Sequence, residues 1–214
     1  MDDAITSPCI YVLAGTNGAG KSSIGGAAFS ANNAGYFNPD EAARRIHSAN
    51  PHISYAEANS LAWHEGLRLL ERAIAERFDY AFETTLGGKT ITNRLETALS
   101  SGIEVRVWYA GLRSSELHIA RVRARVARGG HDITEAKIRE RYDRSRQNLI
   151  RLLPALTELR VYDNSFEADP NAGFAPEPML VLHVLEGKIV GPDDLTQTPD
   201  WAKPIAAAAM SLGN

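Results

Sequence analysis

The chain has 214 residues, a length typical of one domain or of one domain with a small appendage. Hydrophobic residues make up 44% and charged residues 23%, which excludes a disordered chain, and the single cysteine, Cys9, excludes an internal disulfide and suits a reducing compartment. The net charge of −3 argues against nucleic-acid binding by the whole chain. No apolar run is long enough to span a membrane, so we expect a cytoplasmic protein.

The first half of the chain alternates predicted strands and helices. An apolar run at 9–14 predicts a buried strand, which a glycine-rich turn joins to a helix that begins near Lys21. The segment 38–41 (NPDE) predicts a helix start with an asparagine N-cap, proline at the first position and acids in the first turn. Capping-box spacing and apolar periodicity predict a long helix over 54–77, and 79–83 predicts a second strand.

The second half continues the same alternation and ends in a different pattern. Its predicted elements are a helix at 90–100, a strand at 104–109, helices at 114–128 and 134–153 on either side of Gly129-Gly130, a strand at 158–162, and a hairpin of 179–185 with 188–190. Strands separated by helices predict an α/β fold with a mostly parallel sheet flanked by helices. We expect residues 1–165 to form the core, with a lid at about 113–153, and 166–214 to form a C-terminal appendage of hairpin and tail packed on the same domain.

A phosphate-binding motif follows the first predicted strand. The pattern G-x-x-x-x-G-K-S/T places glycines where successive backbone N–H groups can turn toward an anion, at the positive end of the next helix. In this motif the lysine, Lys21, reaches the β- and γ-phosphates, and the hydroxyl of Ser22 binds Mg²⁺. We therefore expect ATP and Mg²⁺ to bind at this loop and at the serine after it: Gly15, Thr16, Asn17, Gly18, Ala19, Gly20, Lys21, Ser22 and Ser23.

Nucleotide binding alone leaves the reaction open. The sequence has neither the N-K-x-D motif of Ras-like GTPases nor the L-S-G-G-Q signature of ABC transporters, and no apolar strand ends in a clear second Walker acid. The acids that the strands offer are Glu83 and Asp163. These absences favour a P-loop kinase fold in which an arginine-rich helical lid closes over ATP.

Arginine is concentrated in the expected lid. The chain has 18 arginines and 5 lysines, and 113–151 holds ten of those arginines and carries a net charge of +6, from eleven basic and five acidic residues. Arg121, Arg125 and Arg128 share one helix face and are the candidates for stabilising the transferring phosphoryl group. His131, after the glycine pair, is a candidate to contact phosphate or to cap the next helix.

The simpler interpretation of these charges is a solvated helical hairpin held by surface ion pairs. We assign Arg123 and Arg146 to such pairs. Arg141 and Arg144 lie together on another side of the second helix.

Transfer to an alcohol needs a carboxylate that orients the hydroxyl and takes its proton. Asp40 and Glu41 are both candidates, and an acid in a first helical turn also has a purely stabilising role, so the residues alone do not separate them. Glu83, Thr84 and Thr85 end the second strand, where ligands of open α/β sheets bind, and can hydrogen-bond a hydroxylated acceptor.

The motifs together resemble the zeta-toxin family of P-loop kinases, in its short bacterial branch that is also labelled predicted ABC-type ATPase. The resemblance covers roughly residues 9–165 and is carried by GTNGAGKSS, FNPDEAAR, FETTLGG, RVARGGHDITEAKIRERYDRSRQNL and VYDNS. It implies ATP- and Mg²⁺-dependent phosphorylation of the 3′-hydroxyl of UDP-N-acetylglucosamine, and a protein antitoxin as partner by analogy. It further implies that Asp40, rather than Glu41, is the base, that Glu83 and Thr85 contact the UDP-sugar, and that the lid arginines neutralise phosphate.

This sequence departs from the family at one point near the acceptor motif. Toxin members carry an arginine shortly after Thr-Leu, where this chain has Gly87 and Gly88, with Lys89 as the nearby cation. We therefore keep three alternatives to the UDP-sugar kinase: a kinase of another small hydroxylated molecule, a kinase of a nucleic-acid end, and a non-catalytic ATP-binding switch module.

Overall fold

The computed structural model describes residues 7–22, 24, 36–166 and 177–213, and its centre is a seven-stranded sheet in the order β2-β3-β1-β4-β5-β6-β7. The first five strands in that order run parallel, and β6 and β7 are antiparallel. The mostly parallel sheet confirms the predicted α/β class. The strands are β1 Cys9–Ala14, β2 Tyr36–Phe37, β3 Tyr80–Thr84, β4 Glu104–Gly111, β5 Glu158–Asp163, β6 Met179–Leu185 and β7 Lys188–Gly191.

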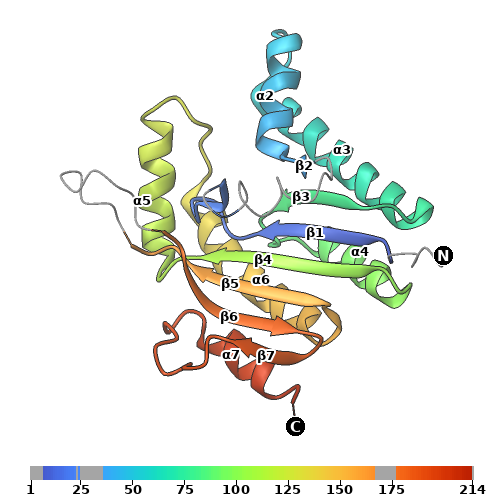
Figure 1. Ribbon diagram of the computed structural model, residues 1–214. Coiled ribbons are helices and arrows are strands. Elements are labelled where there is room, and N and C mark those ends of the chain that lie inside the picture. The colour runs from blue at the N-terminus through green and yellow to red at the C-terminus, as the bar shows by residue number, and fades with distance from the viewer. Residues whose placement is uncertain (1–6, 23, 25–35, 167–176, 214) are drawn as a thin grey trace.

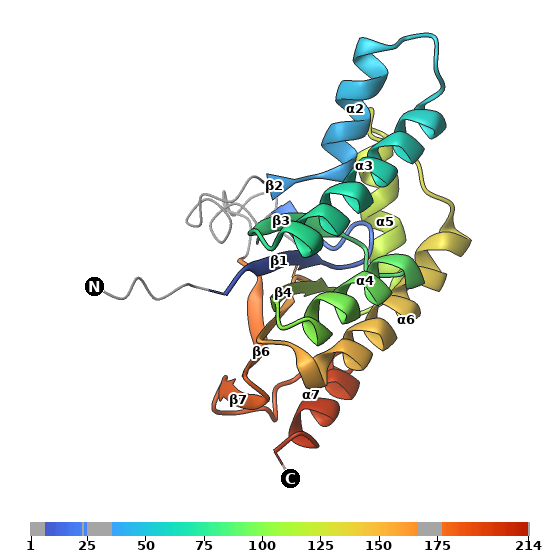
Figure 2. The ribbon, with the colours of Figure 1, turned by 90° about the vertical axis from the view of Figure 1, so that its right-hand side faces the viewer.

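Several of the described helices lie against one face of the sheet. The described helices are α2 Pro39–Ala49, α3 Tyr55–Glu76, α4 Lys89–Ser100, α5 Ser115–Val126, α6 Glu135–Leu152, the short 3-10 helix Leu153–Ala155 and α7 Lys203–Met210. Figure 2 shows α3, α4, α6 and α7 against the same face, whereas α2 and the start of α3 rise above the sheet as a helical pair (Figure 1). Among the described residues, no helix is long and apolar enough to cross a membrane.

Local capping explains where two of these helices begin. The Asn38 side chain accepts hydrogen bonds from the backbone N–H groups of Asp40 and Glu41 at 2.9 and 3.1 Å, which starts α2 as predicted. Ser54 and Glu57 form the predicted capping box of α3. These caps place Asp40 in the first turn of α2, at the carboxyl ends of the parallel strands.

The principal core lies between the sheet and its covering helices. Ile10, Val12, Val107 and Leu159 from the strands are fully buried and pack with Leu70, Leu95, Leu149 and Ile205 from the helices. Burial of this apolar surface is the main free-energy term that holds the sheet edge rigid for the loops that follow the strands.

The C-terminal segment adds to the same sheet. β6 pairs with β5, and β6 and β7 form the predicted hairpin, so the expected appendage extends the sheet by two strands. Trp201 is 3% exposed, and its Nε1–H donates to the Asp163 carboxylate at 3.2 Å. A Cβ atom on Gly111 would lie 2.2 Å from the Trp201 ring, so glycine is needed there for the ring to pack on β4.

Candidate active site

The loop between β1 and the following helix has the backbone of an anion cradle. Gly15, Gly18 and Gly20 have φ values of 143°, 83° and 77°, which L side chains rarely adopt. A Cβ on Gly15 would lie 2.3 Å from the Ala110 carbonyl oxygen, so the loop also passes too close to β4 for any other residue. Lys21 and Ser22 follow in helical conformation. The structure describes the predicted phosphate loop up to Ser22, and Ser23 lies outside the described residues.

Three other elements hold this loop from outside. His118 of α5 donates from Nδ1 to the Asn17 carbonyl at 2.9 Å, and Asn164 after β5 donates to the Ala19 carbonyl at 2.9 Å. Arg141 of α6 donates from Nη1 to Asn17 Oδ1 at 2.7 Å. The helices of the predicted lid therefore contact the phosphate loop directly.

His118 acts in this contact as a neutral ring. Burial is the main reason that its pKa falls to about 4, and the nearby Lys21 ammonium lowers it further, against the hydrogen bond to Asn17 that raises it. A neutral imidazole with its proton on Nδ1 is the form that donates to a carbonyl oxygen.

Lys21 spans the loop and reaches a carboxylate of the next strand. Its ammonium group donates to the Gly15 carbonyl at 2.8 Å and lies 3.4 Å from Glu83 Oε1, and both side chains are nearly buried. Glu83 also accepts from Tyr36 Oη–H at 2.8 Å and from Asn38 Nδ2 at 3.3 Å. Burial and the Glu83 charge raise the pKa of Tyr36, so this phenol stays protonated and donates.

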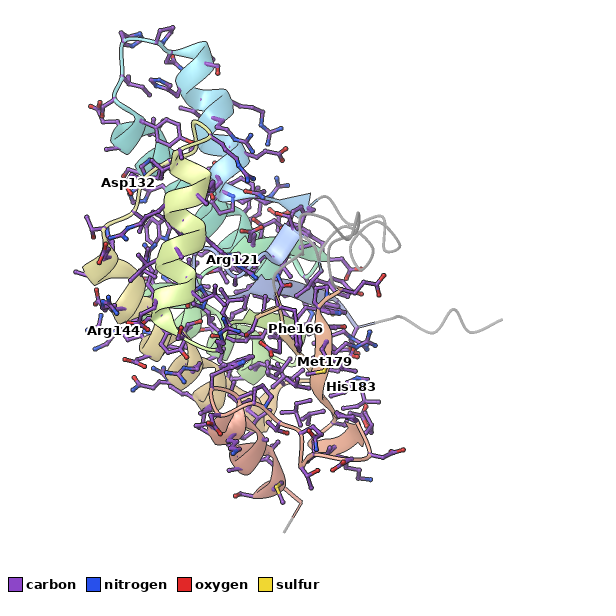
Figure 3. All side chains as sticks on the ribbon, turned by 90° about the vertical axis from the view of Figure 1, so that its left-hand side faces the viewer. Arg121, Asp132, Arg144, Phe166, Met179 and His183 are labelled. Atoms are coloured by element: carbon purple, nitrogen blue, oxygen red, sulfur yellow. The ribbon has the colours of Figure 1, made fainter. Side chains whose placement is uncertain are left out.

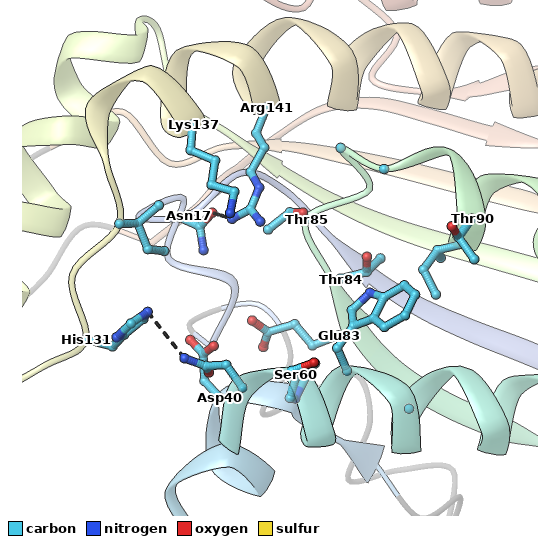
Figure 4. A pocket seen from close by; sticks show the side chains of 18 of the residues that line it. Asn17, Asp40, Ser60, Glu83, Thr84, Thr85, Thr90, His131, Lys137 and Arg141 are labelled. Atoms are coloured by element: carbon cyan, nitrogen blue, oxygen red, sulfur yellow. Dashed lines mark hydrogen bonds between the residues drawn. The ribbon is translucent and has the colours of Figure 1, made fainter. Parts of the chain in front are cut away.

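A cleft of about 750 Å³ opens between the loop, the helical pair and α6. It brings together six residues predicted for the site: Asn17, Lys21, Asp40, Glu83, Thr84 and Thr85. Figure 4 shows the carboxylates of Asp40 and Glu83 toward one side of this cleft and Lys137 and Arg141 projecting into it from the opposite side. Asp40 and Glu41 are both exposed, and Glu41, the other candidate base, is not among the lining residues.

The predicted lid arginines take three different positions. Arg125 lies 3.6 Å from the Asp40 carboxylate and donates to the His131 carbonyl at 2.9 Å. Arg121 donates to the Phe166 carbonyl at 3.1 Å, on the side of α5 away from Arg144 (Figure 3). Arg128 is exposed. None of these three belongs to the lining of the 750 Å³ cleft, although Arg125 contacts its rim through Asp40.

Instead, the cations of the predicted lid that line the cleft come from α6. Lys137, Arg141 and Arg144 share one helix face, and all three border the cleft. The sequence pattern groups Arg141 with Arg144 but assigns neither of them to the site, and it does not single out Lys137. The spacing of the three residues is a usable signal, but nothing in the sequence says which face of α6 meets the loop.

The loop between α5 and α6 rests on α3 through an aromatic contact. The His131 ring stacks on Tyr55 with centroids 4.8 Å apart, and Asn59 Nδ2 lies 3.3 Å from His131 Nε2. His131 thus binds the helical pair, a role that its place in the sequence does not indicate. Asn59, Ser60 and Trp63 of α3 also line the cleft, whereas the helical periodicity of α3 indicates only a packing role for Trp63.

Of the two strand acids, Asp163 has a structural environment. It is 4% exposed and accepts from the Ser165 backbone N–H at 3.1 Å as well as from Trp201. Glu83 alone of the pair lines the cleft.

Comparison with known proteins finds a relative in sequence and several in fold. An uncharacterised protein of Haemophilus influenzae is 34% identical over 129 residues, which cover 60% of this chain and 88% of that protein. A chain of the AvrRxo1-ORF1:-ORF2 complex with ATP superposes with a TM-score of 0.65 at 14% identity over 95% of this chain, which spans only 64% of that chain. A chain from the PezAT chromosomal toxin-antitoxin system of Streptococcus pneumoniae gives 0.56 at 15% identity, over 98% of this chain and 88% of that one.

The two structural likenesses establish the shared fold, and the sequence itself establishes the family. Residues 2–168, most of the chain, match the family described as zeta toxin. The chain is therefore a member of the zeta toxin family with a P-loop kinase fold.

Proposed function

We propose that the protein is an ATP-dependent kinase that transfers the γ-phosphate to a hydroxyl of a small acceptor, with UDP-N-acetylglucosamine as the first acceptor to test. Family membership supports a P-loop kinase-type function, and the acceptor is our proposal. One observation carries it: the loop lysine, Lys21, and the carboxylate of Asp40 line the same cleft.

The residues of the loop suit a nucleotide with Mg²⁺. Described residues form no cluster of three or more His, Cys, Asp or Glu side chains, and the chemistry of a P-loop needs none, because Mg²⁺ keeps several waters and takes its remaining ligands from phosphates and one or two side chains. We assign Ser22, an exposed hydroxyl next to Lys21, as its protein ligand. When bound, the ion neutralises phosphate charge.

On the donor side, the proposed role of Gly15–Ser22 is to hold the phosphates through backbone N–H groups, with Lys21 on the β- and γ-phosphates. Glu83 holds the Lys21 ammonium in the cleft at 3.4 Å. Arg141, fixed by Asn17 at 2.7 Å, is placed to share the γ-phosphate charge as the acceptor attacks.

On the acceptor side, Asp40 accepts the proton of the attacking hydroxyl. The hydroxyl oxygen forms its bond to the γ-phosphorus as the bond to the β-phosphate oxygen breaks, and ADP leaves. Glu83, Thr84 and Thr85 orient the acceptor through hydrogen bonds. Arg125 pairs with Asp40 at 3.6 Å, and we propose that it keeps this carboxylate aimed into the cleft. Arg121 and Arg128 remain proposed phosphate ligands for a more closed lid.

Two further proposals concern the partner and the location of the protein. A protein antitoxin is a proposed partner, since one structural neighbour belongs to a toxin-antitoxin system and another is a two-protein complex. The cytoplasm is the proposed location, because ATP is available there and the buried thiol of Cys9 is free.

The test is transfer from γ-labelled ATP to a panel of acceptors. The panel holds UDP-N-acetylglucosamine, free N-acetylglucosamine, a nucleoside, gluconate and a 5′-hydroxyl oligonucleotide, each with the wild type and with Lys21→Ala. The proposal expects labelled UDP-N-acetylglucosamine with the wild type and none with Lys21→Ala. ATP binding without a labelled product from any acceptor would contradict kinase function and favour a nucleotide switch, whereas label on another acceptor alone would contradict the UDP-sugar.

A further inference from the structure

The cleft has two ends that differ in chemistry, and one face of α3 runs along both. Ala56 and Leu67, the first and last residues of that face, are eleven residues apart, which corresponds to about 16 Å of helix. Near the start of this face, Asn59 contacts His131, and Figure 4 shows Asp40 beside them. Thr90 lies at the other end in the same view. The cleft is therefore long enough for an acceptor larger than one sugar ring.

The end away from Asp40 is apolar. Its wall consists of Phe37, Trp63, Leu67, Phe82 and Ile91. A Cβ atom on Gly66 would lie 2.7 Å from the Phe37 ring, so a glycine in the middle of α3 is what lets that ring lie against the helix. Apolar walls of this kind, with a few polar groups, are the usual lining of small-molecule sites.

Trp63 is the most exposed aromatic side chain of this wall. It is 41% exposed, whereas the other two tryptophans, Trp108 and Trp201, are buried at 6% and 3%. A single exposed apolar residue is ordinary on a protein surface, and Leu61 on the same helix is 51% exposed outside the cleft. The Trp63 ring meets the His64 ring, with centroids 4.9 Å apart and planes at 78°. What distinguishes Trp63 is its place in a concave site, where the exposed part of its ring borders the cleft.

Hydroxyl groups lie around this apolar end. Ser60 precedes Trp63 by three residues on the same face of α3, and Thr84 and Thr90 border the cleft from the sheet side and from α4. A flat apolar wall with hydroxyls around it complements a planar ring that has apolar faces and a polar edge. A flexible alkyl chain would leave those hydroxyls without partners.

We infer that Trp63 stacks on a planar heterocyclic ring of the phosphoryl acceptor and is a specificity-determining residue of the acceptor site. The inference rests on the proposed function only in that it takes this cleft as the acceptor site. Asn59 and Trp63 are four residues, or about 6 Å, apart on α3, so the ring and the reacting hydroxyl occupy different turns of the helix. A free monosaccharide next to Asp40 would leave the Trp63 end unfilled.

The experiment measures binding through the fluorescence of Trp63 itself, with ADP and Mg²⁺ saturating the phosphate loop so that the donor contributes a constant background. The ring-bearing probes, which carry a planar nucleobase, are UDP-N-acetylglucosamine, UDP and adenosine, and the probes without a planar ring are N-acetylglucosamine, whose pyranose ring is puckered, and gluconate. We expect at least one ring-bearing probe to quench the emission and neither probe without a planar ring to do so. We expect Trp63→Phe to lack the quench, because the buried Trp108 and Trp201 supply the remaining emission.

Affinities of Trp63→Ala, measured by calorimetry, complete the test. Loss of one stacking contact predicts a dissociation constant about 5- to 150-fold higher for the quenching probe. The matched control is Leu61→Ala, which removes an exposed side chain of the same helix outside the cleft and is expected to leave the affinity unchanged. Equal affinities of Trp63→Ala and wild type, or no quench by any ring-bearing probe, would overturn the inference.

Failure of this inference and failure of the proposed function give different results. Quenching that depends on Trp63, in a protein that transfers no phosphate, would refute the kinase and retain the ring-binding site. Transfer to UDP-N-acetylglucosamine with an unchanged KM in Trp63→Ala would retain the kinase and refute the role of Trp63.

Discussion

His118 shows how one buried side chain ties the phosphate loop to the lid. Its ring donates to the Asn17 carbonyl, and the α5 backbone also packs tightly there, since a Cβ on Gly18 would lie 2.8 Å from the His118 carbonyl oxygen. Burial keeps its pKa at about 4, below the ordinary value of 6.5. Protonation of His118 at low pH therefore destabilises the folded state, in which the neutral ring holds the loop.

The first prediction concerns the stability of the protein in acid. Between pH 6.5 and about 4 the unfolded chain binds a proton at His118 and the folded chain does not, so stability present above this window is lost as the pH falls through it. The full effect is on the order of 3 kcal/mol. Urea denaturation across this pH range measures the free energy of unfolding. This free energy should decline less with falling pH in His118→Asn than in the wild type, because asparagine keeps a donor for Asn17 but does not titrate. An identical decline in both proteins would contradict a neutral buried ring.

At the residue scale, the sequence predicts which residues are candidates for the site better than it predicts which residues they contact. The phosphate motif and the acids of the first helical turn are local patterns, and they suffice to propose Lys21 and the pair of Asp40 and Glu41 as candidates, of which Lys21 and Asp40 line the cleft. The contact of Arg141 with Asn17 spans 124 residues of sequence and depends on how α6 lies over the loop, which no local pattern encodes.

At the element scale, α6 packs against the turn between β3 and α4. This packing sets the direction in which the cationic side chains of α6 point. A Cβ on Gly87 would lie 2.8 Å from Arg141 Cγ and 3.5 Å from its Cα, so α6 packs directly over this glycine. A Cβ on the adjacent Gly88 would have nothing within 4 Å. The two glycines thus form a matched pair for testing this contact.

The second prediction is that Gly87→Ala displaces Arg141 and weakens the cleft. Overpacking of this size costs about 1–3 kcal/mol and should lower the melting temperature by several degrees. Activity should fall further than stability alone explains, because Arg141 loses its fixed position on Asn17. Gly88→Ala, at the N-cap of α4, should cost less than about 1 kcal/mol. Equal effects of the two substitutions on melting temperature and kcat would contradict this packing.

Helices and strands are predicted well where a capping residue marks their start or where apolar residues recur with a regular period over a long segment. The starts of α2 and α3 follow from Asn38 and from the capping box of Ser54 and Glu57. The sequence does not predict β2, because this strand has only two residues, Tyr36–Phe37, too few for any periodicity. It is formed by pairing with β3, a tertiary contact, and it places Tyr36 on Glu83.

At the scale of the whole molecule, the C-terminal segment supports the sheet from the edge opposite β2. Trp201 packs on Gly111 of β4 and donates to Asp163 at the end of β5. Asn164, the next residue, holds the Ala19 carbonyl of the phosphate loop. The distant end of the chain thereby stabilises the strand that positions the loop.

The third prediction is that Trp201→Ala destabilises the protein by about 3–5 kcal/mol, because it removes a large buried ring and leaves a cavity. Met210→Ala, which truncates a side chain that is 58% exposed on α7, should change stability by less than about 0.5 kcal/mol. Denaturant titration of both variants measures the difference. A small loss for Trp201→Ala would show that the C-terminal segment contributes little to the fold.

Alternating strand and helix signals suffice to predict the architecture, because each element bears its own periodicity. The composition of the cleft cannot be predicted in the same way, because its lining comes from five separate parts of the chain, residues 17–21, 37–40, 56–67, 82–91 and 131–144. In the sequence, Trp63 and Lys137 are ordinary helical residues. Only the tertiary packing of these segments places them in the cleft.

The fourth prediction tests the central claim, that Asp40 is the base across the cleft from the phosphate loop. The measurement is the rate of γ-phosphate transfer by Asp40→Asn and Glu41→Gln under saturating ATP, with ATP affinity measured alongside. These neighbours differ in place, since Asp40 lines the cleft and Glu41 does not. We expect Asp40→Asn to bind ATP normally and to lose about 10²–10⁴-fold in rate, while Glu41→Gln stays near wild type. Full activity of Asp40→Asn, or an equal loss in Glu41→Gln, would contradict the account.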